Sequence, residues 1–519
     1  MKIVWIPTFL LAAGAAFSAS GVYSVRDFGA TGDGKTLDTA AINKAIDACT
    51  AAGGGQVLLP PGTYLSGTVV LKSNVMLRLD AGARLLGTSD LTQYKNYNPP
   101  AGSFEARSPR WQNALVLISG VENVGISGEG IIDGNKVNDP RGEERMRGPH
   151  ALVAGSSKNL TIRDVHFKDA ANYAMLIEWT DEVNIQNVKA TGGWDGIHLR
   201  WCKNVVISGC QLYTGDDAIA GRYWENVLIT QCVLNSSCNG IRVIGPAKGL
   251  IIQNSLIYGP GLHPHRTSNR YNLLAGIYLQ PGSWDPSEGA LDDVLISDIT
   301  MRNPATPFRL TMNKNNKGGE IIFNRISATG VYRGGILLES KDDPVQRVVL
   351  RDINIEYTKD DPALKAEHRP LPAWGLTARH LKNLLFENVR LTALERDWRP
   401  MMILDDIEDV SVDGMRFPPT AGEGASIVMN NVRRQEIRDA GAALLDARCT
   451  ALGAAEAPVA GKPYSATATV VNGAAAGLGK VELQAGEQDL IRWVWLKPNE
   501  TRKVVFDGVM AAAGTQELR

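Results

Sequence analysis

Short apolar strands recur through this 519-residue chain at a spacing close to 22 residues. From Val183 the pattern steps to Val205 and Val227, and Cys210 is followed by Cys232 at the same interval. Other strands of this kind include Asn159-Leu-Thr-Ile162, Leu250-Ile-Ile252, Val294-Leu-Ile296, Val348-Val-Leu350 and Leu384-Leu-Phe386. A fixed period with short β-rich segments and little helical periodicity is typical of a parallel β-helix, whose equivalent residues stack about 4.8 Å apart. Leucine-rich repeats share the period, but their Leu-x-x-Leu-x-Leu pattern is missing.

Different patterns flank the repeats. Residues 38–52 carry a convincing amphipathic helix, with Ile42, Ala45, Ile46 and Cys49 on one face, and such a helix would cap the open edge of the first coil. A segment rich in Ala, Gly and Pro at 454–462 predicts a linker, and alternating strands follow at 464–471, 480–483, 490–496 and 502–506. We therefore expect a β-helix domain over 21–450 and a small immunoglobulin-like β-sandwich over 456–519. Packing and carbohydrate contact are both open as the role of the sandwich.

The first twenty residues have the pattern of a secretory signal peptide. Lys2 precedes an apolar run from Ile3 to Phe17, and small residues follow at 18–21. The run is too short to predict a membrane span, and the alternative is a buried N-terminal helix. We expect an exported protein, periplasmic or extracellular, that is a monomer.

Positive and negative charges nearly cancel, with 54 Lys and Arg against 55 Asp and Glu. This balance argues against nucleic acid or an anionic membrane as the partner. Six cysteines in a chain of this length do not make a disulfide scaffold. We expect Cys210 and Cys232 to stack inside as small apolar residues, with a bond between neighbouring coils left open.

Three consecutive repeats carry acidic or amide residues at one position: Asp195-Gly-Ile-His-Leu-Arg200, Asp217-Ala-Ile-Ala-Gly-Arg222 and Asn239-Gly-Ile-Arg-Val-Ile244. A β-helix would place Asp195, Asp217 and Asn239 one above another, with Asp216 beside Asp217. Acids this close repel one another, so one should hold its proton at neutral pH. A protonated acid beside an ionised one can cleave a glycosidic bond, because one protonates the leaving oxygen and the other activates water. The alternative is that these acids cap turns.

Strand alternation predicts which residues share the face of the acids. The expected core positions are Ile197, Leu199, Ile219, Ile241 and Val243. Their alternates His198, Arg200, Arg222 and Arg242 would then point outward, and adjoining coils would add Glu178, Tyr278, Gln280 and Arg309.

Arginines beside acids suit a substrate that bears carboxylates, because guanidinium and carboxylate groups pair through two hydrogen bonds. The alternative is a surface row of arginines neutralised by acids. The aromatic residues Trp194, Trp201, Tyr223 and Trp224 lie beside the strip, where they could stack on sugar rings or be wedged into turns.

Several segments resemble the polygalacturonases of glycoside hydrolase family 28. They are Val25-Arg-Asp-Phe-Gly-Ala-Thr-Gly-Asp-Gly34, Asp38-Thr-Ala-Ala-Ile42, Gly54-Gly-Gln-Val-Leu-Leu-Pro-Pro-Gly-Thr-Tyr64, Leu77-Arg-Leu-Asp-Ala-Gly82, Gly128-Glu-Gly-Ile-Ile-Asp-Gly134 and Arg147-Gly-Pro-His150. Trp194-Asp-Gly196 and Gly215-Asp-Asp217 are similar to that family's catalytic motifs. The resemblance implies a right-handed parallel β-helix and single-step hydrolysis with inversion. It implies Asp216 as general acid, Asp195 and Asp217 as the pair that activates water, and no metal or organic cofactor.

The sequence departs from that family at two motifs. Cys238-Asn239-Gly240 stands where the family has Gly-His-Gly, so an assisting histidine is missing and His198 is a candidate substitute. The segment 272–280 lacks the family's Arg-Ile-Lys, and Arg200, Arg222 and Arg242 could supply the charge instead. Inserts at 95–111 and 259–272 are expected to wall off one end of the groove, which favours action from a chain end.

The favoured interpretation is a glycoside hydrolase that acts on an acidic, pectin-type polysaccharide or oligosaccharide. One alternative is a polysaccharide lyase or epimerase, in which Arg200, Arg222 or His198 would act at a sugar C5 and Asp216 with Asp217 would hold Ca²⁺. Another is a non-catalytic carbohydrate-binding solenoid whose acids are structural.

Overall fold

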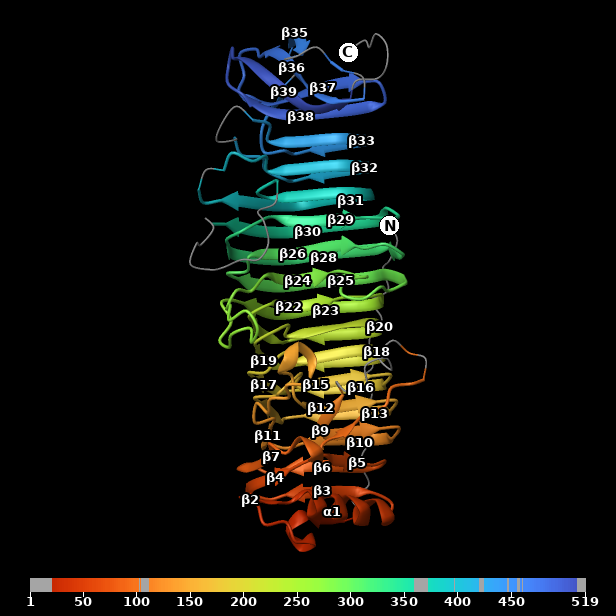
Figure 1. Cartoon of the computed structure of the whole chain (residues 1–519). Helices are drawn as coiled ribbons and strands as arrows, with labels where there is room; N and C mark the ends of the chain where they lie inside the picture. The colour runs from red at the N-terminus through yellow and green to blue at the C-terminus, as the bar shows by residue number, and fades with distance from the viewer. Residues whose placement is uncertain are drawn as a thin grey trace, which may run out of the picture.

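The chain forms a long stack of β-coils with one α-helix at its N-terminal end and a small β-structure at its C-terminal end (Figure 1). The computed structural model describes residues 21–101, 103, 112–358, 372–395, 397–419, 424–445, 448–454, 458–459 and 461–510. The predicted signal peptide, residues 1–20, lies outside them. In the described part, no helix is long and apolar enough to cross a membrane.

The N-terminal coils are built from β1 to β11. The strands are β1 (Val22–Ser24), β2 (Asp33–Leu37), β3 (Gly55–Leu59), β4 (Gly62–Ser66), β5 (Val69–Leu71), β6 (Val75–Leu79), β7 (Ala83–Gly87), β8 (Lys95–Asn96), β9 (Asn113–Ser119), β10 (Glu122–Ser127) and β11 (Ile131–Asp133). Helix α1 (Thr39–Ala51) covers this end and buries Ile42, Ala45, Ile46 and Cys49, which confirms the predicted cap.

The middle coils carry the acidic repeats. Their strands are β12 (His150–Gly155), β13 (Lys158–Arg163), β14 (His166–Lys168), β15 (Met175–Glu178), β16 (Asp181–Gln186), β17 (Lys189–Thr191), β18 (Ile197–Ser208), β19 (Gln211–Thr214), β20 (Ile219–Thr230), β21 (Val233–Ser236), β22 (Asn239–Val243), β23 (Ala247–Tyr258) and β24 (Ala275–Leu279).

The later coils continue the same stack. They are built from β25 (Gly289–Arg302), β26 (Thr306–Met312), β27 (Asn316–Gly318), β28 (Glu320–Val331), β29 (Ile336–Ser340), β30 (Val345–Tyr357), β31 (Leu376–Ala393), β32 (Met402–Asp413) and β33 (Ile427–Arg438).

Parallel pairing fixes the register that the repeat predicts. Ile197 faces Ile219 on the next coil, and Ile219 faces Ile241 on the one after it. All three are fully buried in one continuous core. The fold is a right-handed parallel β-helix, so residues 22 positions apart in these coils lie side by side.

Asparagine side chains link the outer turns of neighbouring coils. Asn226 Nδ2 donates to Asn204 Oδ1 at 3.1 Å, and Asn204 Nδ2 donates to Asp181 Oδ1 at 2.8 Å. Both asparagines have positive φ, a left-handed conformation that Asn tolerates better than most residues. The Asn that precedes several of the apolar strands is therefore a turn signal of the coil.

Cys210 and Cys232 are buried in the stack as free thiols, which matches the expected apolar stacking. The possible bond between neighbouring coils is not formed. All six cysteines are free.

The C-terminal strands close the other end of the stack. They are β34 (Leu444–Leu445), β35 (Arg448–Ala454), β36 (Pro463–Val471), β37 (Gly477–Ala485), β38 (Gln488–Leu496) and β39 (Thr501–Met510). Strands β35, β36 and β39 form a separate antiparallel sheet, so this unit includes residues before the predicted start at 456. Strand β38 pairs antiparallel with β33, which covers the last edge of the β-helix. The immunoglobulin-like assignment stays a prediction.

Candidate functional site

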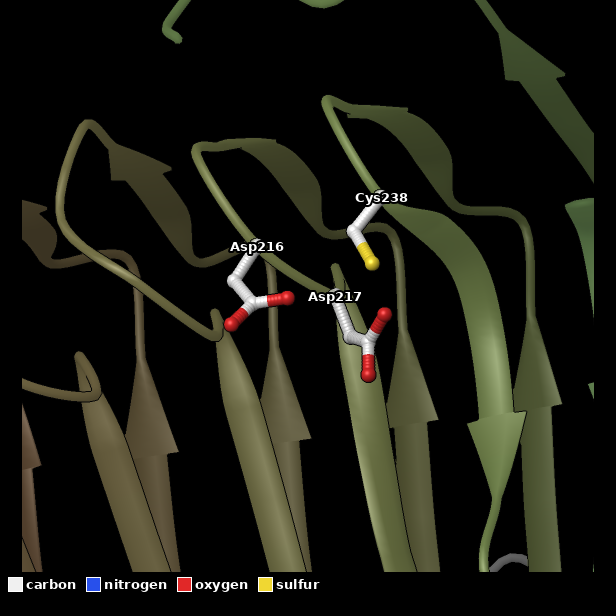
Figure 2. Close-up of side chains that lie close together, drawn as sticks. All are labelled: Asp216, Asp217 and Cys238. Atoms are coloured by element: carbon white, nitrogen blue, oxygen red, sulfur yellow. The ribbon is translucent and has the colours of Figure 1, made fainter. Parts of the chain in front are cut away.

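Three carboxyl groups from two neighbouring coils meet just before strands β18 and β20. The backbone N–H of Asp217 donates to Asp195 Oδ1 at 3.2 Å. The backbone N–H and Nδ2 of Asn239 donate to Asp217 Oδ1 at 3.1 and 2.7 Å. Figure 2 shows Asp216 and Asp217 on one coil and Cys238 on the next. The 22-residue spacing therefore predicts the stacking of this acidic cluster, defined as Asp195, Asp216 and Asp217.

The backbone at Asp216 is held from three sides. Thr214 Oγ1 and Ser236 Oγ donate to the carbonyl of Asp216 at 2.9 and 2.7 Å. A Cβ on the preceding Gly215 would lie 2.6 Å from the carbonyl oxygen of Pro264, so only glycine fits there. The turn thus fixes where the carboxyl group of Asp216 is presented.

Solvent reaches the three acids unequally. The side chains of Asp195 and Asp217 are 5% and 6% exposed, whereas that of Asp216 is 16% exposed. Burial, with the charges of Asp216 and Asp217, raises the pKa of Asp195 well above its ordinary value. Burial also raises the pKa of Asp217, against the opposing effect of Arg242. The cluster therefore retains a proton above the pH at which an ordinary aspartate has lost it.

Two arginines face the cluster from either side. Arg147 Nη2 lies 3.8 Å from Asp216 Oδ2, and Arg242 Nη1 lies 3.7 Å from Asp217 Oδ2. The guanidinium of Arg147 also lies over the ring of Trp194, 3.7 Å from its centroid. These nearly buried cations offset part of the repulsion between the acids.

His198 is bound to the deepest acid. Its Nδ1 lies 2.7 Å from Asp195 Oδ2, and its ring stacks on Tyr173 with centroids 4.7 Å apart. Burial, together with Arg200 and Arg222, lowers the pKa of His198 well below its usual value, so the ring is neutral. Its buried Nε2 has no hydrogen-bond partner among the described residues.

A second histidine reaches the cluster from the insert at 259–272. His265 Nε2 lies 3.7 Å from Asp216 Oδ2. Its Nδ1 lies within hydrogen-bond distance of Thr267 Oγ1 and Ser268 Oγ, and it accepts the backbone N–H of Ser268 at 3.4 Å. Since Nδ1 accepts a backbone N–H, the proton of a neutral ring is on Nε2 and faces Asp216.

The insert is anchored to the coil that carries Asn239. Asn235 Oδ1 accepts the backbone N–H of Leu262 at 2.7 Å, and Ser237 Oγ donates to the carbonyl of His263. Arg270 Nη2 donates to Cys238 Sγ at 3.2 Å. The sequence does not single out His265 and Arg270. It indicates only the insert at 259–272 that carries them, which is expected to wall off one end of the groove.

Three of the predicted binding residues, Asn239, Tyr278 and Gln280, lie on the coils that follow the cluster. Asn239 supports Asp217, and Gln280 Oε1 accepts from Arg242 Nη2 at 3.0 Å. Tyr278 lies between Arg242 and Arg309, whose guanidinium carbons are 5.9 and 4.9 Å from its ring centroid. Asn239 and Tyr278 are themselves buried, and the side chain of Arg242 is 14% exposed.

Glu178, His198 and Arg222 lie on the outer face of the strands as expected, but they are covered rather than open to solvent. Glu178 is 0% exposed and Arg222 is 3% exposed. Neighbouring loops cover them: Gln112 Nε2 donates to Glu178 Oε2 at 3.2 Å, and Arg222 Nη1 donates to Asp285 Oδ2 at 3.2 Å. Arg200, the partner of Glu178 at 2.9 Å, keeps partial exposure.

The predicted aromatic residues are mostly structural. Trp194 is fully buried, and Trp224 donates its Nε1–H to the carbonyl of Leu199 at 3.0 Å. Trp201 and Tyr223 stack on each other at a turn, with centroids 3.6 Å apart. Their burial and stacking favour the wedged arrangement over open sugar-binding faces.

Several known proteins are similar to this chain in sequence. Residues 22–243 match the family model described as rhamnogalacturonase A/epimerase, pectate lyase-like. An exo-poly-alpha-D-galacturonosidase of Dickeya chrysanthemi is 38% identical over 119 residues, which are 22% of this chain and 19% of that protein. An exopolygalacturonase of Arabidopsis thaliana is 26% identical over 372 residues, covering 65% of this chain and 79% of that protein. The chain is therefore similar to polygalacturonases over part of its length, and its fold is a parallel β-helix.

Other similar proteins have different named roles. Plasmin and fibronectin-binding protein A of Streptococcus pneumoniae (strain ATCC BAA-255 / R6) is 34% identical over 177 residues, 33% of this chain and 24% of that protein. This chain therefore spans less than a quarter of the length of two of the three relatives.

Among solved structures, the family 28 exopolygalacturonase of Yersinia enterocolitica has a TM-score of 0.47 at 17% identity, covering 80% of this chain and 78% of that one. The A-module of mannuronan C-5 epimerase AlgE4 of Azotobacter vinelandii has a TM-score of 0.36 at 17% identity, covering 80% and 97%.

One group in this site has the spacing of a metal-ligand set. Ligand atoms of Asp216, Asp217 and Cys238 lie within 4.8 Å of one another. However, Arg147, Arg242 and Arg270 direct guanidinium groups at the same three side chains. Three fixed positive charges around these atoms disfavour the binding of a metal cation. They favour side chains that are negatively charged or that share a proton.

Two surface hollows lie elsewhere on the β-helix. One, about 510 Å³ in volume, is lined by Asp292, Lys317, Asp343 and Lys382 among others, and another of about 640 Å³ by Arg78, Glu129 and Arg163 among others. Neither is lined by a carboxylate of the acidic cluster. The chemistry of the side chains, rather than the size of a cavity, identifies the candidate site.

Proposed function

We propose that the chain is a glycoside hydrolase that cleaves an acidic, pectin-type polysaccharide or oligosaccharide. The observation that carries this proposal is the convergence of Asp195, Asp216 and Asp217 at one spot with unequal access to solvent. Hydrolysis of a glycosidic bond needs one carboxylic acid to protonate the leaving oxygen and one carboxylate to activate water.

The geometry supports Asp216 as the group that meets the substrate. It is the most exposed of the three acids and lies between Arg147 and His265. In the proposed reaction Asp216 gives a proton to the glycosidic oxygen, and Asp195 with Asp217 removes a proton from the attacking water. This assignment requires the proton of the cluster to lie on Asp216 when the substrate is bound, with Asp195 and Asp217 ionised.

Charge supports a substrate that bears carboxylates. Arg242 keeps partial exposure, and Arg309 adds a second cation next to Tyr278. The wall formed by residues 259–272 contacts the cluster on one side through His265, which supports action from a chain end. Export from the cell, expected from residues 1–20, is part of this proposal, since such substrates are extracellular polymers.

The direct test is the product analysis of polygalacturonate and other plant and bacterial polysaccharides after incubation with the chain. Hydrolysis should release new reducing ends without ultraviolet-absorbing unsaturated sugars, and the Asp216→Asn variant should release none. Reducing ends that form equally with Asp216→Asn would remove Asp216 from the mechanism.

A lyase or epimerase remains a second candidate because of one arrangement in the site. His198 is neutral and buried, its Nε2 is without a partner among the described residues, and Tyr173 stacks on its ring. Such a pair could exchange the proton at C5 of a uronic acid. Unsaturated products, or epimerised polymer without new chain ends, would favour this function over hydrolysis.

A further inference from the structure

One tryptophan near the acidic cluster is almost fully exposed to solvent. Trp284, on the loop between β24 and β25, is 77% exposed, whereas Trp194 and Trp224 are buried. Its backbone is left-handed, with φ of 66°, a costly conformation for a bulky residue. An exposed indole in a strained turn loses burial energy and backbone energy together, so packing within the chain does not explain it.

The loop that presents Trp284 is tied down on both sides. Asp285 pairs with the buried Arg222, and its backbone N–H donates to the carbonyl of Ser283 at 2.8 Å. Ser287 Oγ donates to Asn316 Oδ1 at 2.9 Å, and Asn316 Nδ2 donates back to the carbonyl of Ser287 at 2.9 Å. The base of the loop is therefore fixed while the indole is left open, which is the preorganisation that a binding surface needs.

Arg242 connects this indole to the acidic cluster. Its guanidinium carbon lies 5.5 Å from the centroid of the Trp284 ring, and its Nη1 lies 3.7 Å from Asp217 Oδ2. Within the described residues, Gln280 is its one hydrogen-bond acceptor. Arg242 therefore keeps donors for a ligand carboxylate at a point between the aromatic ring and the catalytic groups.

We propose that Trp284 and Arg242 form a subsite for one uronic acid residue beside the bond that is cleaved. The indole packs against the apolar C–H face of the pyranose ring, and the guanidinium pairs with the carboxylate of the same sugar. This inference rests on the proposed function for the position of the sugar relative to the cleaved bond. The binding of the sugar does not depend on turnover.

The test measures binding of oligogalacturonides, from dimer to hexamer, to the full chain carrying Asp216→Asn, by titration calorimetry. Adding Trp284→Ala should raise Kd about tenfold, and Trp284→Phe should restore part of the affinity. The matched control is Trp398→Ala, because Trp398 is 83% exposed but lies between β31 and β32, several coils away. Its Kd should stay within twofold of the parent.

Neutral galacto-oligosaccharides of the same lengths separate the two parts of the subsite. Trp284→Ala should weaken their binding too, whereas Arg242→Ala should weaken only the binding of the acidic sugars. Equal Kd values for Trp284→Ala and Trp398→Ala, or no binding of oligogalacturonides by the parent, would overturn the subsite.

The subsite and the proposed function can fail separately. Hydrolysis by the wild-type chain with no effect of Trp284→Ala on binding would remove the subsite and leave the hydrolase. Binding that depends on Trp284 without any product would keep the subsite and remove the hydrolase.

Discussion

Replacing Asp217 by asparagine should stop catalysis while leaving the fold as stable as before or more so. Asn has the same shape, and its Oδ1 can still accept the backbone N–H and Nδ2 of Asn239. What disappears is a negative charge that is held, nearly buried, beside Asp195 and Asp216. Catalysis needs that charge, but burying it lowers the stability of the folded state.

The expected loss of rate follows from the role of a general base. Removing such a group typically costs 10²- to 10⁴-fold, which corresponds to about 3–5 kcal/mol of transition-state stabilisation. The loss should be in kcat, because Asp217 is only 6% exposed and lies under the more exposed Asp216.

The effect on stability should depend on pH with a defined sign. Burial raises the pKa of Asp217, so the folded chain keeps a proton that the unfolded chain has already lost above about pH 4. The wild-type chain therefore loses stability as pH rises from the ordinary aspartate pKa through the raised one. Asn does not titrate, so the difference in Tm between Asp217→Asn and the wild type should increase in favour of the variant over this window. Above the window the difference should stay constant.

A matched control has the opposite electrostatic setting. Asp133 is also buried, but Arg84 Nη2 lies 2.7 Å and Lys168 Nζ 3.6 Å from its Oδ2. Asp133→Asn should cost about 1–3 kcal/mol of stability and leave kcat unchanged. Thermal unfolding between pH 4 and 8 with steady-state kinetics on polygalacturonate measures both variants. A large drop in the Tm of Asp217→Asn at pH 8 would show that the charge of Asp217 stabilises the fold. An unchanged kcat would show that catalysis does not need this charge.

The other predictions concern four residues. Asp216→Asn should lower kcat by several orders of magnitude and barely change Tm, whereas a Tm drop of many degrees would mark Asp216 as structural. His265→Phe should lower kcat about tenfold at unchanged KM and shift the pH profile. His265→Gln keeps a donor toward Asp216 and should recover part of the rate. Equal kinetics of the two variants would show that His265 has no such role. Arg222→Ala should destabilise the chain by about 1–3 kcal/mol because it removes the packing of a buried side chain together with its bond to Asp285, and a normal Tm would contradict this. Gly221→Ala should prevent folding, because its Cβ would lie 1.8 Å from the carbonyl oxygen of Leu199 at a φ of 145°; a soluble variant with wild-type circular dichroism would show that the coil can move.

The position of the acidic cluster could be predicted because it depends on one number, the length of a coil. Once Asp195 and Asp217 are 22 residues apart in a β-helix, parallel pairing brings them together, as the bond from Asp217 N–H to Asp195 Oδ1 records. The helical cap could be predicted for a similar reason, because the apolar face of α1 depends only on the spacing of residues within one short segment.

Features that depend on loops could not be predicted from the repeat. Alternation places Glu178 and Arg222 on the outer face of the strands, but Gln112 and Asp285 fold over them from segments with no periodicity. His265 and Arg270 reach the site for the same reason, from an insert whose path is set by contacts with Asn235 and Cys238. The pairing of β38 with β33 is likewise long-range, because an alternating strand does not specify its partner.

A crystal structure of the Asp216→Asn chain with an acidic oligosaccharide bound would show directly whether the acidic cluster meets the sugar. We expect a glycosidic oxygen within hydrogen-bond distance of residue 216 and a sugar carboxylate paired with Arg242. A sugar chain bound only at another face of the β-helix, away from residues 195, 216 and 217, would contradict it.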